Sequence, residues 1–155
     1  MSVLDVSRPA INPPITQSAI MVEAERWLGT PYCHQAARRG VGADCLGLVV
    51  GVWQAVSGTK VALTRANTRA WARHAKGEPL LDGLRQVLVE CPVGDAQPGD
   101  VLALRWRHTW PASHLSILMD DETMIHAYEG GQVVRSHLAP WVSHAAAAFV
   151  FPISL

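Results

Sequence analysis

The chain has 155 residues, of which 49% are hydrophobic and 17% charged, a composition typical of a folded domain with a sizeable core. Its 13 basic and 13 acidic residues cancel, so the net charge gives no support to a nucleic-acid partner or an anionic membrane surface. No segment reaches the ~18 consecutive apolar residues of a membrane span, so membrane insertion is not expected.

The first 16 residues differ from the rest of the chain. They contain Pro9, Pro13 and Pro14, they have no apolar run, and they lack the pattern of a secretory signal peptide. Because prolines disfavour a helix, we expect an extended arm over residues 1–16 and a single domain over residues 17–155.

Hydrophobic periodicity predicts helices in the first half of the chain and strands in the second. The apolar spacing indicates a helix over residues 17–28, a strongly apolar helix that starts near Cys45, and two further helices over residues 65–76 and 79–90. After the turn Pro98-Gly99-Asp100, period-2 patterns predict strands over residues 101–106, 113–119, 123–128, 132–136 and 146–151. Helices followed by antiparallel strands predict a segregated α+β domain.

Cys45 is the strongest candidate for a reactive side chain. It follows Asp44, a good helix N-cap, so it should lie in the first turn of the apolar helix, at the positive end of the helix dipole. That position lowers the pKa of a thiol. Gly47 and Gly51, inside the same helix, indicate that another strand approaches it closely. The alternative is a buried structural cysteine on a core helix.

His114 and His126 are candidate partners for this thiol. Period-2 alternation places His114 and Ser116 on one face of a predicted strand, and His126 on one face of the next strand. An odd-length loop between the strands brings the two histidines to the same side of the sheet as opposite or diagonal neighbours, whereas a two-residue loop separates them. The small Ser116 leaves room for the glycine-bearing helix to press on the sheet. Taken singly, each histidine could equally be structural.

The cysteine pattern argues against other kinds of site. Three cysteines, an odd number, do not form a disulfide framework. Cys33 and His34 are adjacent rather than at zinc-ligand spacing, and no H-E-x-x-H motif occurs, so we expect no metal site. Cys91 continues the apolar stripe of the helix predicted over residues 79–90, which indicates a core position.

Five short motifs occur in order along the chain: Gly29-Thr30-Pro31-Tyr32, Asp44-Cys45-Leu46-Gly47-Leu48, Pro98-Gly99-Asp100, Ser113-His114-Leu115-Ser116-Ile117 and Met124-Ile125-His126-Ala127. Together they resemble the NlpC-like cysteine peptidases, which have a papain-like fold and cut bacterial cell-wall stem peptides. The resemblance spans residues 17–151, nearly the whole chain. It implies a papain-like domain in which a nucleophile helix packs on a C-terminal antiparallel sheet.

The resemblance also implies roles for individual residues. Cys45 would be the nucleophile, His114 the base and His126 the polar residue that orients it, with no cofactor. Tyr32 would lie beside the thiol and assist the oxyanion, while the backbone N–H of Cys45 is the expected oxyanion donor. Asp44 and Leu46 flank the nucleophile and would position substrate.

Two departures from the family pattern bear on which peptide bond is cut. Leu46 stands where the family commonly has a serine that contributes to substrate binding, and Cys33-His34-Gln35-Ala36 replaces the common Trp-Gly-Gly. The His-Gln pair with Asp-Cys-Leu-Gly is closer to the branch found in phage tails and phage-like particles. We therefore expect a protein made in the bacterial cytoplasm, carried by tail-tip or baseplate hub proteins, and acting on peptidoglycan stem peptides at the periplasmic cell wall. The arm over residues 1–16 would be its tether.

Two other functions stay open from the sequence: a catalytically silent tail-hub or wall-binding module, and a lipid-directed acyltransferase or hydrolase on a related fold. For the thiol, a helix end contributes at most about 2 kcal/mol, or about 1.5 pKa units. We therefore expect a protonated His114 to supply the rest of the reduction in the pKa of Cys45.

Overall fold

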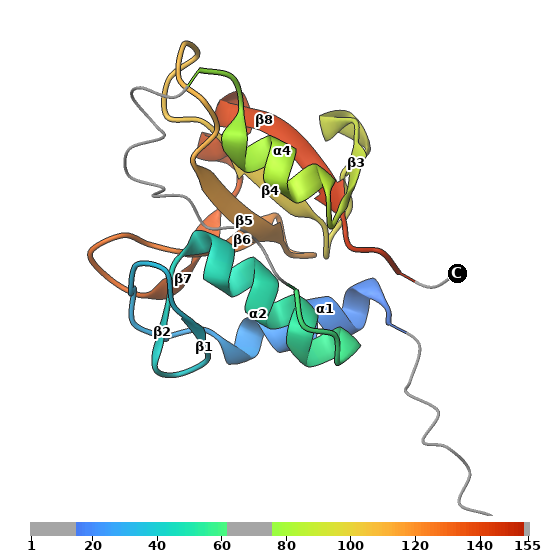
Figure 1. Ribbon diagram of the computed structural model, residues 1–155, viewed down its shortest axis with the longest axis vertical. Helices are drawn as coiled ribbons and strands as arrows, with labels where there is room; N and C mark the ends of the chain where they lie inside the picture. Colours follow the sequence, from blue (N-terminus) through green and yellow to red (C-terminus); the bar gives the residue numbers. More distant parts are fainter. Residues whose placement is uncertain (1–14, 62–75, 154–155) are drawn as a thin grey trace, which may run out of the picture.

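The structure, a computed structural model, describes residues 15–61 and 76–153 (Figure 1). Most of the predicted arm and almost all of the helix expected over residues 65–76 lie outside these ranges. The helices are α1 (Gln17–Arg26), α2 (Cys45–Ser57) and α4 (Pro79–Arg85), together with two short 3-10 helices, η1 (Val93–Asp95) and η2 (Ala139–His144). No helix of the described part is long and apolar enough to cross a membrane.

A six-stranded antiparallel sheet forms the second half of the domain. Its spatial order is β3-β8-β4-β5-β6-β7. The strands are β3 (Val89–Cys91), β4 (Val101–Leu104), β5 (His114–Leu118), β6 (Thr123–Ala127), β7 (Val133–His137) and β8 (Ala145–Val150). A separate two-stranded ribbon, β1 (Ala37–Arg38) and β2 (Gly42–Ala43), precedes α2. The predicted α+β class is confirmed.

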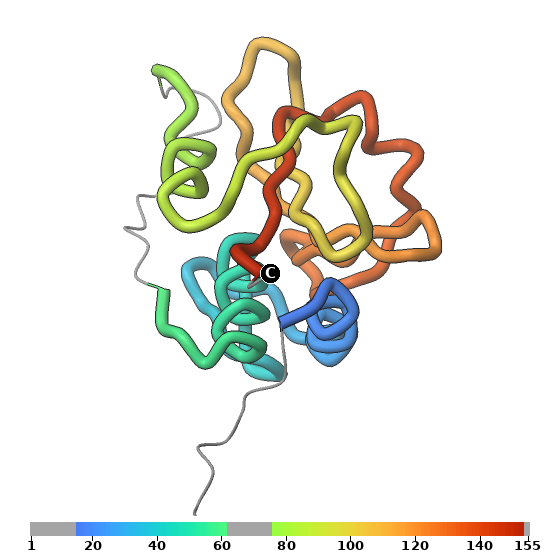
Figure 2. Tube along the Cα trace, turned by 90° about the vertical axis from the view of Figure 1, so that its right-hand side faces the viewer, coloured from blue at the N-terminus to red at the C-terminus, as the bar shows by residue number. Residues whose placement is uncertain are grey.

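Helices α1 and α2 lie side by side against one face of the sheet, where the main core forms (Figures 1 and 2). Leu115 and Ile117 of β5 point into this core. Ser116 alternates to the opposite face, where its hydroxyl donates to the carbonyl oxygen of Leu102 at 3.2 Å. The expectation that Ser116 makes room for α2 is therefore wrong, because α2 packs on the face that Ser116 does not share.

The two glycines of α2 lie where neighbouring atoms leave no room for a side chain. A Cβ atom at Gly47 would lie 1.8 Å from the carbonyl oxygen of Ala36, and one at Gly51 would lie 2.2 Å from the indole of Trp27. The predicted close approach is confirmed, but no strand makes it: the approaching groups belong to the loop before β1 and to Trp27 at the end of α1.

The prediction of a helix over residues 79–90 is wrong for its second half. Helix α4 ends at Arg85, and residues 89–91 form β3, which pairs with β8 at the edge of the sheet. The ion pair between Arg85 and Glu90 spans the turn between these elements. Leu88 lies after the end of α4 but is still buried, so this apolar residue of the predicted helix packs in the core without being helical. Cys91, expected in the core, is half-buried and packs against a small apolar cluster on the outer face of the sheet.

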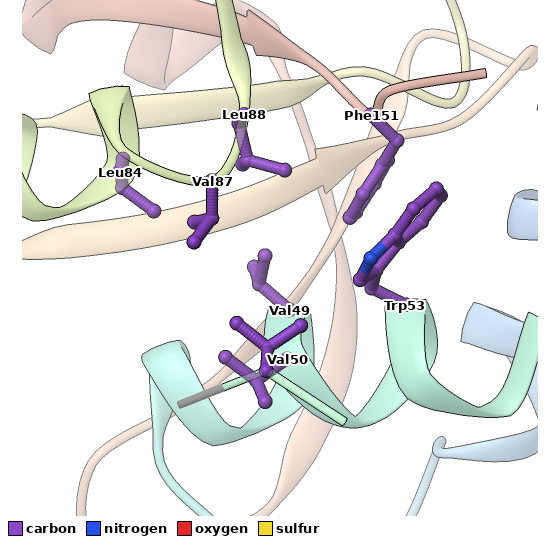
Figure 3. Close-up of a pocket in the computed structure, with 8 residues that line it drawn as sticks. Val49, Val50, Trp53, Leu84, Val87, Leu88 and Phe151 are labelled. Carbon is purple, nitrogen blue, oxygen red and sulfur yellow. The ribbon is translucent and has the colours of Figure 1, made fainter. Parts of the chain in front are cut away.

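An apolar pocket lies between α2 and α4 (Figure 3). Its lining side chains are Val49, Val50, Trp53, Val61, Leu84, Val87, Leu88 and Phe151. The rings of Trp53 and Phe151 stack with centroids 5.3 Å apart. Because all eight side chains are apolar, this part of the core is held by packing alone.

Candidate active site

Cys45 is the first residue of α2, and Asp44 is its N-cap, as predicted. The carboxylate of Asp44 is buried and accepts two backbone hydrogen bonds. The N–H of Gly47 donates to Oδ1 and the N–H of Gln35 donates to Oδ2, each with an N–O distance of 2.7 Å. It therefore caps the helix and fastens the preceding loop to the helix start at the same time. The position of the thiol depends on both contacts.

The thiol of Cys45 lies at the edge of β5, where β5 and β6 separate. These strands pair only through Ile117 with Ile125 and Leu118 with Met124, so the start of β5 has no partner in β6. The thiol lies 3.8 Å from the carbonyl oxygen of Ser113 and within hydrogen-bonding reach of the N–H of Leu115. The sulfur thus occupies the point where the sheet opens, next to the residue that precedes His114.

His114 and His126 lie together on the outer face of the sheet. The turn between β5 and β6 contains Glu122 in the left-handed region, with φ of 59°, and the N–H of Met119 donates to the carbonyl oxygen of Thr123. This closes an odd, three-residue loop. The resulting register makes the histidines diagonal neighbours, with Nε2 of His114 at 2.8 Å from Nδ1 of His126. The predicted same-face geometry is confirmed.

A third polar group continues this line of contacts. Nε2 of His126 lies 2.8 Å from Oγ of Ser136 on β7. Ser136 was not predicted from the sequence, because its position opposite Met124 depends on the β6–β7 register. The only local indication was that Ser136 is a polar residue at an alternating position of the predicted strand.

Two tryptophans enclose the histidine pair and were also not predicted. The ring centroids of Trp106 and Trp141 lie 5.5 Å and 6.4 Å from that of His114, and Trp141 lies 5.9 Å from His126. Trp141 comes from η2, while Trp106 follows β4 and is 44% exposed. The sequence contains six tryptophans, and composition alone does not indicate which of them line a site. The histidines therefore sit in an aromatic enclosure with one wall open to solvent.

Burial shifts the pKa values of the thiol and the imidazole in opposite directions. It raises the pKa of Cys45 to about 12, with a further contribution from the negative charge of Asp44, against N–H contacts from Leu115, Leu46 and Cys45 itself, which lower it. Burial, together with the neighbouring His126, lowers the pKa of His114 to about 3. The pKa of His126 is also lowered by burial. Burial therefore favours the neutral thiol and the neutral imidazole over the thiolate and imidazolium that the sequence led us to expect.

The remaining predicted residues flank the nucleophile. The backbone of Tyr32 bridges to Ala43, two residues before Cys45, and its side chain packs partly against the core. The side chain of Leu46 is 4% exposed and packs in the core, so contact with a substrate would have to come from its backbone. Cys33 is exposed, and within the described residues no group of three or more His, Cys, Asp or Glu side chains could hold a metal ion.

Comparison with known proteins gives consistent matches over most of the chain. Residues 29–148 match the NlpC/P60 family. A gamma-DL-glutamyl hydrolase of Bacillus subtilis is 27% identical over 132 residues, which are 85% of this chain and 28% of that protein. The chain thus spans less than a third of the length of this relative.

Solved structures share the fold at low sequence identity. The NlpC/p60 domain of the peptidoglycan hydrolase SagA superposes with a TM-score of 0.64 at 21% identity, covering 88% of this chain and 100% of that domain. An NlpC/P60 family protein of Bacillus cereus gives 0.63 at 17% identity, covering 90% and 41% of the two chains. The peptidoglycan hydrolase RipB of Mycobacterium tuberculosis gives 0.60 at 17% identity, covering 90% and 65%.

The helix-borne cysteine, the histidine pair on the sheet and the match over residues 29–148 agree with one another. The chain belongs to the NlpC/P60 family of cysteine peptidases and has the papain-like fold of that family.

Proposed function

We propose that this protein is a cysteine peptidase that hydrolyses peptide bonds in the stem peptides of bacterial peptidoglycan. The observation that carries the proposal is the pairing of His114 with His126 at the open end of β5, with the thiol of Cys45 3.8 Å from the carbonyl oxygen of Ser113, the residue before His114. A nucleophile, a base and a group that orients the base are the three parts that acyl transfer requires. Their presence together argues against a catalytically silent module.

The first step is attack by the sulfur of Cys45 on the substrate carbonyl carbon. Nε2 of His114 is engaged by His126, so Nδ1 is the ring nitrogen left to accept the thiol proton. Because burial disfavours the charged forms of both groups, we infer that His114 takes the thiol proton as the sulfur attacks. The N–H of Cys45, at the start of α2, stabilises the oxyanion that forms.

The second half of the reaction reverses these roles. The imidazolium of His114 gives its proton to the leaving amine, and a thioester remains on Cys45. Water then attacks the thioester carbon with His114 as base, and the sulfur leaves as the thiol. No cofactor takes part.

We propose a γ-linked glutamyl bond as the scissile bond. Its support is the likeness to the gamma-DL-glutamyl hydrolase of Bacillus subtilis, together with structural neighbours that are peptidoglycan hydrolases. Trp106, 44% exposed beside His114, offers an apolar wall to the substrate on the open side of the enclosure.

Digestion of purified peptidoglycan tests this function. The expected result is release of stem-peptide fragments whose masses and new amino termini identify cleavage at the γ-glutamyl bond, with no effect of chelators. The Cys45→Ala variant should release none. Absence of any new amino terminus with the wild-type protein would refute the peptidase function, and cleavage only at other bonds would refute the proposed bond.

We further propose that the protein works within a phage tail or a phage-like particle of the gene-transfer type, carried by tail-tip or baseplate hub proteins. The support is the resemblance of His34-Gln35 and Asp44-Cys45-Leu46-Gly47 to that branch of the family. Residues 1–16 would be the tether, of which residues 1–14 lie outside the described ranges. Mass spectrometry of purified particles should detect the protein, and a variant lacking residues 1–14 should hydrolyse peptidoglycan but be depleted from particles. Equal incorporation would refute the tether.

A further inference from the structure

A continuous line of polar contacts runs from the start of β5 to β7. His114 Nε2 contacts His126 Nδ1 at 2.8 Å, and His126 Nε2 contacts Ser136 Oγ at 2.8 Å. Each ring nitrogen named in these contacts has one partner, and each contact joins neighbouring strands of the sheet. The orientation of any one hydrogen bond in this line therefore constrains the others.

We propose that Ser136 is a positioning residue, whose hydroxyl oxygen accepts the Nε2 proton of His126 and thereby selects the tautomers in which Nδ1 of His114 is free to act as the base. The proposal rests on the catalytic role proposed above for His114.

A neutral imidazole carries one proton, on either Nδ1 or Nε2. If Ser136 accepts from Nε2 of His126, then Nδ1 of His126 has a lone pair and accepts from Nε2 of His114. His114 then has its proton on Nε2 and a lone pair on Nδ1, which is the tautomer that can take the proton of Cys45. Each hydrogen bond is then donated in the same direction, from His114 to His126 and from His126 to Ser136 on β7.

The opposite direction gives an unproductive pair. If the hydroxyl of Ser136 donates to Nε2 of His126, the proton of His126 is on Nδ1 and is donated to Nε2 of His114. The proton of His114 is then on Nδ1, and neither of its nitrogens can accept from the thiol. Ser136 is half-buried, so its own hydroxyl proton can be donated to solvent while its oxygen accepts from His126.

The productive direction also suits the charge that develops during the reaction. When His114 takes the thiol proton, the donor at its Nε2 carries positive charge and needs an acceptor at Nδ1 of His126. The titratable neighbour behind this pair is His144, whose ring lies 6.0 Å from that of Trp141 and whose Nδ1 contacts the carbonyl oxygen of Arg105. Nδ1 of His144 is thus engaged by the backbone, whereas Nε2 of His126 is engaged by Ser136.

Nitrogen-15 NMR of the ring nitrogens in the wild-type protein at neutral pH reads this pattern directly. Each tautomer has one protonated and one bare ring nitrogen with distinct chemical shifts. The proposal predicts protonated Nε2 and bare Nδ1 in both His114 and His126. Protonated Nδ1 in His126, or an equal mixture of tautomers, would overturn it. The experiment needs no substrate, so it fails or succeeds independently of the proposed peptidase function.

Variants of Ser136 provide the second test. Ser136→Ala should give mixed tautomers in His126 and lower kcat by about 3- to 10-fold with KM unchanged, the effect of one neutral hydrogen bond. Ser136→Thr keeps the hydroxyl and should restore both. Ser136→Asp can only accept, so it should keep the productive tautomers and move the acid limb of the kcat/KM profile upward by about 1 pH unit.

Ser116→Ala is the matched control. Ser116 lies on the same face of the sheet, but its hydroxyl donates to Leu102 rather than to a histidine. Its loss should leave the tautomers and the acid limb unchanged, even if the melting temperature falls. If Ser136→Ala keeps the wild-type tautomers, or if Ser136→Asp leaves the acid limb in place, Ser136 has no positioning role.

Discussion

Helix α2 is buried from Cys45 to Trp53, but the two ends of this stretch are buried for different reasons. At the first turn, Cys45 and Asp44 are surrounded by backbone N–H and C=O groups and by the loop that approaches Gly47. At the last turns, Trp53 stacks on Phe151 in a region lined by apolar side chains alone (Figure 3).

This difference separates function from stability within one helix. Burial at the last turns removes apolar surface from water and stabilises the fold. Burial at the first turn works against the charged forms of Cys45 and His114, so it costs stability wherever those groups would ionise. Changes at the two ends should therefore have different consequences, and three substitution or pH experiments test this.

The largest expected effect is on stability, at the last turns of α2. Phe151→Ala removes a ring that is 1% exposed and stacked on Trp53, and should lower the free energy of unfolding by about 3–5 kcal/mol. Denaturant unfolding measures this loss. Val142→Ala, at an exposed apolar side chain, is the control and should change stability by less than about 0.5 kcal/mol. Under conditions where Phe151→Ala is folded, its kcat should equal that of the wild type, and a large drop in kcat would contradict the separation.

The next effect is on activity, at the first turn. Gly47→Ala places a Cβ atom 1.8 Å from the carbonyl oxygen of Ala36, and a backbone atom cannot move aside as a side chain can. The start of α2 must shift, and a displacement of about 1 Å can lower kcat/KM by about 100-fold. Gly83→Ala in α4, where a Cβ atom meets nothing within 4 Å, should keep full activity and raise stability by up to about 1 kcal/mol. Wild-type activity in Gly47→Ala would show that the close approach has no role in placing Cys45.

The smallest effect is a pH dependence that arises at the histidine pair. The pKa of His114 is about 3 in the folded protein and about 6.5 when unfolded, so below pH 6.5 the unfolded chain binds a proton that the folded chain does not. The free energy of unfolding should therefore decrease as the pH is lowered through this window, by about 2 kcal/mol from pH 7 to pH 5. Chemical denaturation at several pH values measures the slope.

His114→Ala removes this contribution, so its stability should change less over the same pH window. Carboxylates elsewhere affect both proteins alike, and the difference between the two curves isolates the imidazole. Parallel curves for wild type and variant would show that His114 is not held neutral by burial.

Local patterns were sufficient to predict much of the fold and the core of the site. The Asp44 cap with the apolar run after Cys45 predicted α2, and period-2 alternation predicted the strands that carry His114 and His126. These features are encoded by residues near each other in sequence. The sequence did not decide between an odd-length and a two-residue loop after β5. In the structure the loop has three residues, and Glu122 adopts the left-handed conformation in it.

The parts that were missed depend on long-range placement. Ser136 meets His126 only through the β6–β7 register, and Trp141 reaches the histidines from the short helix η2. The thiol lies where β5 and β6 are no longer paired, and neither strand has a sequence pattern that predicts where this pairing stops. The depth of burial of Cys45, which raises the pKa of its thiol, is likewise a property of the whole fold.

The central claim, that Cys45 is the nucleophile, is tested most directly by trapping the covalent intermediate. The protein is mixed with a γ-glutamyl stem peptide, quenched in acid within the first turnovers, and digested for mass spectrometry. The account predicts a thioester-linked acyl group on the peptide that contains Cys45, and none in the Cys45→Ala protein. An acyl group on another residue, or cleavage without any adduct and with full activity in Cys45→Ala, would contradict it.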